Sequence, residues 1–105
     1  MSLHSVWDTM ILPTRKGKHT VAEYGAALNE RITDEHVKEW AAGTPLTWAV
    51  ESWRIAREVV YAGVAPAGDP PRLEEAYVEK AQPVVEEQIQ KAGVRLATAL
   101  NLAFR

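Results

Sequence analysis

Residues 84–103 read VVEEQIQKAGVRLATALNLA, and this stretch decides the fold class because its apolar side chains keep the period of a helix. Residues that recur at intervals of three and four share one face of a helix. Here they are Val85, Ile89, Ala92, Leu96, Ala99, Leu100 and Ala103. We therefore predict a long C-terminal helix. Gly93 inside it costs about 1 kcal/mol relative to alanine, which predicts that another helix approaches closely there.

The segment before this helix contains two boundary signals. Pro83 suits the first turn of a helix, where its missing N–H costs nothing, so we predict a break at Gln82-Pro83 and a separate helix from about Arg72 to Ala81. The stretch from Gly63 to Pro71 is rich in Gly, Pro and Ala, and it is predicted to be the longest loop.

Two helices are predicted at the start of the chain. The first runs from about Leu3 to Leu12 and stops at Pro13, because a proline disfavours helical backbone at the residue before it. The second runs from about His19 to Arg31, and its inward stripe comprises Val21, Tyr24, Ala27, Leu28 and Ile32.

Two further helices begin at threonine caps. Thr33 is a suitable N-cap for a short helix that ends near Ala42-Gly43, with Val37, Trp40 and Ala41 on its buried side. Thr44-Pro45 opens a helix that reaches about Tyr61 and has Trp48, Ile55 and Val59 on one face. In this helix we interpret Glu51 and Ser52 as packing and hydrogen-bonding residues, not as catalysts.

No stretch alternates with the period of a strand, so the predicted fold class is all-α, with five to six helices forming a bundle. The chain has 105 residues, 47% of them hydrophobic and 25% charged, which predicts a single helical unit over residues 1–105. It has no cysteine, which excludes disulfides and thiolate metal sites. The net charge of −2 gives no basic footprint for nucleic acid, and no apolar run is long enough for a membrane span.

The stretch Leu3-His4-Ser5-Val6-Trp7-Asp8-Thr9 contains the candidate metal ligands. His4 and Asp8 are four residues apart, so on a helix they present an imidazole nitrogen and a carboxylate oxygen to the same point. These donors suit zinc and would fill half of a tetrahedral shell. The spacing alone fits a surface hydrogen bond or a helix cap more often than a metal site.

The whole string resembles the last metal-binding motif of the zinc-dependent single-strand nucleases, the S1/P1 nuclease family, whose fold is shared with bacterial zinc phospholipase C. The resemblance continues in order through Trp48-Ala49-Val50-Glu51-Ser52, Tyr61, Ala92-Gly93-Val94-Arg95-Leu96-Ala97 and Leu100-Asn101. It implies the C-terminal part of that fold. The chain is therefore expected to be a fragment of a larger nuclease domain.

The resemblance also implies a function. Family members cleave phosphodiester bonds of single-stranded DNA and RNA and remove 3′-phosphates by means of a three-zinc cluster, and they are secreted or periplasmic. His4 and Asp8 match two ligands of one zinc, so this chain is expected to hold at most one partial site and no catalytic residue of its own. The residues that bind nucleic acid are not identified. The chain alone is expected to be inactive, and no secretory signal is visible in it.

Several other residues have both a functional and a structural interpretation. Trp7, Trp40, Trp48 and Trp53 could stack on bases, but we expect them to be core residues. We interpret His19 and His36 as surface or cap residues, and the basic turn of Arg15, Lys16 and Lys18 as solvated in preference to phosphate-binding.

Two alternatives to the nuclease remain open: a metal-free helical fragment that acts only as an assembly or interaction module, and part of a phospholipase C-like hydrolase. Expected partners are a single-stranded nucleic acid or nucleotide substrate for the intact enzyme, and a second copy of the chain for the fragment. Self-association is expected because cutting the domain at Leu3 should expose apolar faces, including those of Val6, Trp7 and Met10.

Overall fold

The computed structural model describes residues 4, 7, 11, 20–62 and 75–105. In these ranges the elements are α3 (Val21–Glu30), α4 (Asp34–Ala41), α5 (Pro45–Ile55), the π-helical segment η2 (Ala56–Val60) and α6 (Glu75–Ala103). No strand occurs among these residues, which confirms the all-α class. They form four α-helices in place of the five to six predicted, and the predicted loop from Gly63 to Pro71 lies outside them.

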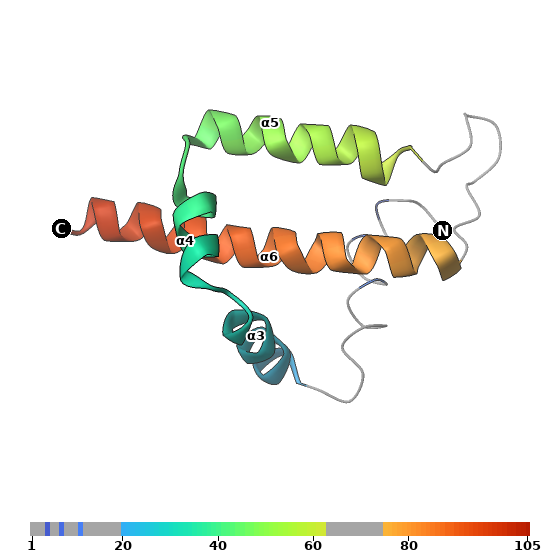
Figure 1. Cartoon of the computed structure of the whole chain (residues 1–105), viewed down its shortest axis with the longest axis horizontal. Coiled ribbons are helices and arrows are strands. Elements are labelled where there is room, and N and C mark those ends of the chain that lie inside the picture. The colour runs from blue at the N-terminus through green and yellow to red at the C-terminus, as the bar shows by residue number, and fades with distance from the viewer. Residues whose placement is uncertain (1–3, 5–6, 8–10, 12–19, 63–74) are drawn as a thin grey trace.

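The helices are arranged around α6, which runs through the length of the molecule (Figure 1). In that view α5 extends along one side of α6, α3 lies on the other side, and α4 crosses α6 between them. The molecule measures 51 × 34 × 21 Å. No described helix is both long and apolar enough to cross a membrane.

Side-chain caps determine where the first three helices begin. Thr20 accepts a hydrogen bond from the Glu23 N–H and starts α3 two residues later than predicted. Thr33 caps α4 as predicted, in a capping box in which the Thr33 N–H donates to His36 Nδ1 at 3.1 Å. Thr44 caps α5 in the same way, with Pro45 at its first turn. The predicted starts of α4 and α5, and the cap role of His36, are confirmed.

Gly43 makes the sharp turn between α4 and α5, with φ of +91°. A side chain there would meet Thr47 Oγ1 of the α5 capping box, and L-residues disfavour this backbone conformation.

We predict that Gly43→Ala lowers the free energy of unfolding by about 2 kcal/mol, measured by urea titration with circular dichroism. Gly25→Ala in α3, where a Cβ meets nothing within 4 Å, is the control and should raise the free energy by about 1 kcal/mol. Equal effects of the two changes would contradict this account of the turn.

The predicted break at Gln82-Pro83 is wrong, because α6 is one continuous helix with Pro83 inside it. A proline in a helix interior removes one backbone hydrogen bond and costs about 3 kcal/mol. Packing on both sides of Pro83 offsets this cost. Ala81 and Val85 are 2% and 9% exposed in a cluster with Ile11, and Gln82 Nε2 donates to the Ile11 carbonyl at 3.5 Å.

The apolar stripe predicted for the C-terminal helix is only partly buried. Val85 lies in the core, but Ile89, Leu96 and Leu100 are 40%, 61% and 47% exposed. A Cβ at Gly93 meets nothing within 4 Å, so the predicted close approach of another helix is absent among the described residues. The described helices cover only the N-terminal end of the stripe.

The faces of the shorter helices that were predicted to be buried contain both buried and exposed side chains. In α3, Leu28 is 4% exposed but Val21 is 76% exposed, and in α4 Trp40 is 5% exposed but Val37 is 44% exposed. Trp53 is 58% exposed, with the Arg57 guanidinium 4.6 Å from its ring centre, so the prediction that it is a core residue is wrong. An indole ring and a guanidinium attract each other even when both are exposed, so this contact does not require Trp53 to be buried.

Candidate functional site

The structure describes only one of the two predicted zinc ligands. His4 lies in helical backbone and is exposed, whereas Asp8 lies outside the described residues. The convergence of their side chains therefore stays a prediction. No cluster of three or more His, Cys, Asp or Glu residues that could hold a metal occurs in the described ranges. The two donors suit zinc in kind, but they supply only half of a tetrahedral shell.

Trp7, three residues after His4, anchors the motif on α6. Its Nε1–H donates to the Tyr77 hydroxyl at 2.9 Å, and the two rings meet edge to face, with centroids 6.4 Å apart and an interplanar angle of 85°. Ile11, 1% exposed, packs against Ala81 and Val85 on the same helix. Trp7 and Ile11, on either side of Asp8 in the sequence, therefore both contact the N-terminal third of α6.

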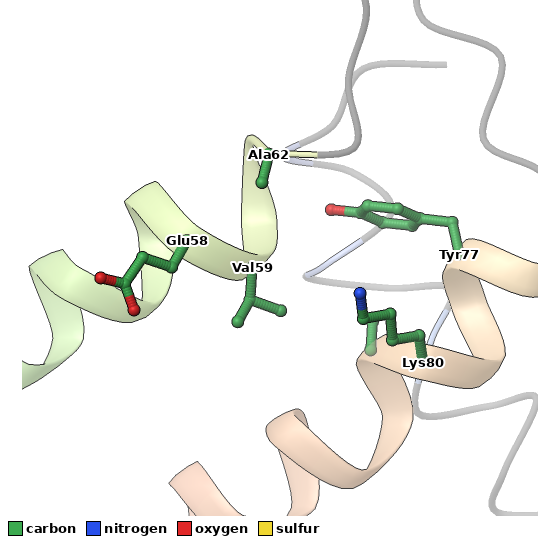
Figure 2. Close-up of a pocket in the computed structure, with 6 residues that line it drawn as sticks. Glu58, Val59, Ala62, Tyr77 and Lys80 are labelled. Carbon is green, nitrogen blue, oxygen red and sulfur yellow. The ribbon is translucent and has the colours of Figure 1, made fainter.

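Tyr77 joins three segments through one hydroxyl group. It accepts from Trp7 and donates to the Val60 carbonyl at 2.6 Å, at the end of η2. Figure 2 shows the Tyr77 hydroxyl pointing from α6 toward the segment that carries Val59 and Ala62. No pattern in the sequence predicts the role of Tyr77, because its partners Trp7 and Val60 lie 70 and 17 residues away.

We predict that Tyr77→Phe lowers the free energy of unfolding by about 2 kcal/mol, since it leaves the half-buried Trp7 N–H and the Val60 carbonyl without their partner. Urea unfolding, followed by tryptophan fluorescence, measures the change. Tyr61→Phe is the matched control, because Tyr61 is 63% exposed, and it should have almost no effect. A loss at Tyr77 no larger than at Tyr61 would show that the hydroxyl does not connect these segments.

Two pockets formed by described residues are unsuited to catalysis. The first, of about 150 Å³, lies between η2 and α6 and is lined by Glu58, Val59, Ala62, Tyr77, Lys80 and Ala81 (Figure 2). It is smaller than the roughly 300 Å³ at which ligand pockets begin. The second, of about 500 Å³, lies at the C-terminal end of α6 beside Pro45, Trp48 and Leu102. Its lining contains no acidic, basic or histidine side chain that could transfer a proton.

A charged cluster joins α5 to α6. Arg95 Nη2 and Lys91 Nζ lie 2.7 Å and 2.9 Å from the Glu51 carboxylate, and Arg95 Nε donates to the Trp40 carbonyl of α4 at 3.0 Å. Ser52 Oγ donates to the Trp48 carbonyl within α5 at 3.2 Å. Glu51 and Ser52 are thus packing and hydrogen-bonding residues, as predicted from the sequence.

The electrostatics of this cluster follow from its contacts. The hydrogen bond from Arg95 is the main reason why the pKa of Glu51 is lowered to about 2; burial opposes this shift, and the hydrogen bond and charge of Lys91 add to it. Burial works to lower the pKa of Lys91, but its hydrogen bonds to Glu51 and Glu87 prevail, so this pKa is raised. Glu51 and Lys91 therefore both stay charged at neutral pH, and neither is suited to exchange protons with a substrate.

A second cluster joins α3 to α6 around Glu86, which is 6% exposed. The Tyr24 hydroxyl donates to Glu86 Oε2, and Arg31 Nη2 lies 3.2 Å from the same oxygen. Nearby, Gln90 Nε2 donates to the Leu28 carbonyl at 2.8 Å. These contacts position α3 on α6.

Comparison with known proteins identifies the family of this chain. The S1/P1 nuclease family model matches residues 1–105. Endonuclease 2 of Arabidopsis thaliana is 34% identical over 114 residues, which cover 98% of this chain and 38% of that protein. Nuclease S1 of Aspergillus oryzae is 32% identical over 117 residues, covering 96% and 40%. No solved structure matches significantly. The chain spans about two-fifths of the length of these curated relatives and belongs to the S1/P1 nuclease family.

Proposed function

We propose that this chain is part of a zinc-dependent endonuclease that hydrolyses phosphodiester bonds of single-stranded DNA and RNA and has 3′-nucleotidase activity. The observation that carries the proposal is the family match over residues 1–105, which includes the motif with His4 and Asp8. The names Endonuclease 2 and Nuclease S1 support the nuclease class. The family resemblance further implies a secreted or periplasmic location for the intact enzyme.

In this proposal His4 and Asp8 bind one zinc ion of the intact enzyme. Zinc at such a site supplies a water-derived nucleophile at neutral pH and charge stabilisation at phosphate oxygens. The other residues of this chain position the motif: Trp7 and Ile11 hold it on α6, and Tyr77 fixes Trp7. The net charge of −2 agrees with an enzyme whose metal ions, and not a basic surface, meet the phosphate.

The proposal makes the 105-residue chain a component and not an enzyme by itself, because two donors make at most one partial zinc site. A chimera tests this. In it, the chain replaces the segment of Nuclease S1 that it matches. We predict that the chimera hydrolyses single-stranded DNA in a zinc-dependent reaction, whereas the isolated chain with added zinc does not exceed a zinc-only blank. A folded, zinc-loaded chimera without activity, or an active isolated chain, would contradict the proposal.

A further inference from the structure

Trp7 lies between the two predicted zinc ligands in the sequence, three residues after His4 and one before Asp8. His4 and Trp7 both have helical backbone, and residues three apart in a helix point about 60° apart around its axis. A rotation of the helix about that axis therefore moves both side chains together. A contact that holds Trp7 is thus placed to set the direction in which this turn presents His4.

Tyr77 holds Trp7 through two contacts of different geometry. The Trp7 Nε1–H donates to the Tyr77 hydroxyl at 2.9 Å, and the two rings meet edge to face at an interplanar angle of 85°. The hydrogen bond holds the indole at its nitrogen, because such bonds weaken steeply when they bend. The ring contact favours one tilt between the planes. Together they restrict the rotation of the Trp7 side chain.

The Tyr77 hydroxyl is itself aligned by η2. It donates its proton to the carbonyl of Val60, the last residue of η2, at 2.6 Å. The last carbonyls of a helix have no partner within the helix, so Val60 is free to accept this bond. A hydroxyl whose proton is committed directs its lone pairs elsewhere and accepts more strongly. The position of Val60 therefore favours the bond from Trp7, and π-helical turns such as η2 are rare and frequent at functional sites.

We propose that Tyr77 is a positioning residue for zinc binding at His4 and Asp8. Its hydroxyl transmits the positions of η2 and α6, through Trp7, to the turn that carries the ligands. The inference rests on the proposed function, because it requires that His4 and Asp8 bind zinc. Residues that orient metal ligands change metal affinity by about 10- to 100-fold. Tyr77 acts through one further residue, so we expect the lower end of this range.

Zinc titrations of the 105-residue chain, followed through the NMR signals of His4, test the proposal. Tyr77→Phe keeps the ring and removes the hydroxyl, so it should raise the zinc dissociation constant about 10-fold. Gly43→Ala is the control. It is expected to destabilise the chain about as much as Tyr77→Phe, but at the turn between α4 and α5, and it should leave the zinc dissociation constant unchanged. Circular dichroism verifies that each variant is folded during the titration.

A double-mutant cycle shows whether Tyr77 acts through Trp7. Trp7→Phe removes the N–H donor and should also raise the zinc dissociation constant. If both changes break the same contact, the double variant should show a rise well below the product of the two single effects. Multiplying effects would mean that Tyr77 and Trp7 act independently.

The outcomes separate this role from the assignment of the ligands. The positioning role is wrong if zinc shifts the His4 signals of the unaltered chain and the dissociation constant is the same in folded Tyr77→Phe. An equal rise in Gly43→Ala, or independent effects of Tyr77 and Trp7, would also overturn it. If zinc does not shift the His4 signals of the unaltered chain, the ligand assignment itself fails, and the role of Tyr77 fails with it.

Discussion

Replacing His4 with alanine in the active chimera is expected to lower its rate of single-stranded DNA hydrolysis by more than about 100-fold. The loss of residues that only orient a metal ligand costs about 10- to 100-fold, so the loss of a ligand should cost more. His4 is exposed, so the variant should still fold, which circular dichroism verifies. Initial rates with saturating zinc, together with zinc content, measure the effect.

His36→Gln is the matched control for this experiment. His36 accepts the Thr33 N–H in the α4 capping box, and glutamine at this position can serve the same box. The control should keep full activity. If His4→Ala kept full activity in a folded chimera, His4 would not be a zinc ligand, whatever the family resemblance.

The second large effect is expected at Glu51. Glu51→Ala leaves Arg95 and Lys91, whose side chains are each only 13% exposed, without their shared carboxylate, and we predict a loss of about 3 kcal/mol in the free energy of unfolding. Glu58→Ala is the control, because its ion pair with Arg57 is more than half exposed at both ends and should contribute little. Urea unfolding at pH 7 compares the two. Similar losses at Glu51 and Glu58 would show that the cluster does not join α5 to α6.

The same cluster predicts a dependence of stability on pH. The folded-state pKa of Glu51 is about 2, below its ordinary value of 4.5, so its contribution is complete above pH 4.5 and is lost as the pH falls toward 2. After allowance for the 31% exposure of Glu51, the contribution is about 2 kcal/mol. Stabilities of the unaltered chain and Glu51→Gln should therefore converge over this pH range. A constant difference across it would contradict the low pKa.

Local signals predicted the fold well where a few neighbouring residues decide the structure. The caps at Thr33 and Thr44 bond to backbone three residues ahead, and Pro45 at N1 needs nothing from the rest of the chain, so the starts of α4 and α5 were predictable. Pro83 is the counterexample. Its local preference favours a helix start, but tertiary packing of its neighbours Ala81 and Val85 on Ile11 retains it within α6.

The candidate site was predictable only in part. The spacing of His4 and Asp8 and the resemblance of the surrounding string identified the motif, but not how it is supported. Contacts between Tyr24 and Glu86, and between Trp7 and Tyr77, join residues 62 and 70 positions apart, and no periodicity in one sequence predicts such pairs.

The stripe of α6 illustrates a different limit. Its period correctly identifies a helix with one apolar face, and a pattern of this kind evolves where the face is covered. What covers Leu96 and Leu100 is not among the described residues, and the chain spans only two-fifths of its curated relatives. The pattern therefore predicts a face suited to burial, and the burial observed among the described residues does not match it.

A zinc titration of the 105-residue chain, followed through the NMR signals of its three histidines, tests most directly whether His4 and Asp8 are zinc ligands. We predict weak, saturable binding of one zinc ion per chain that shifts the His4 signals, leaves those of His19 and His36 in place, and disappears in both His4→Ala and Asp8→Ala. Zinc binding that persists in His4→Ala, or that shifts His19 or His36 and not His4, would contradict the assignment of His4 and Asp8 as zinc ligands.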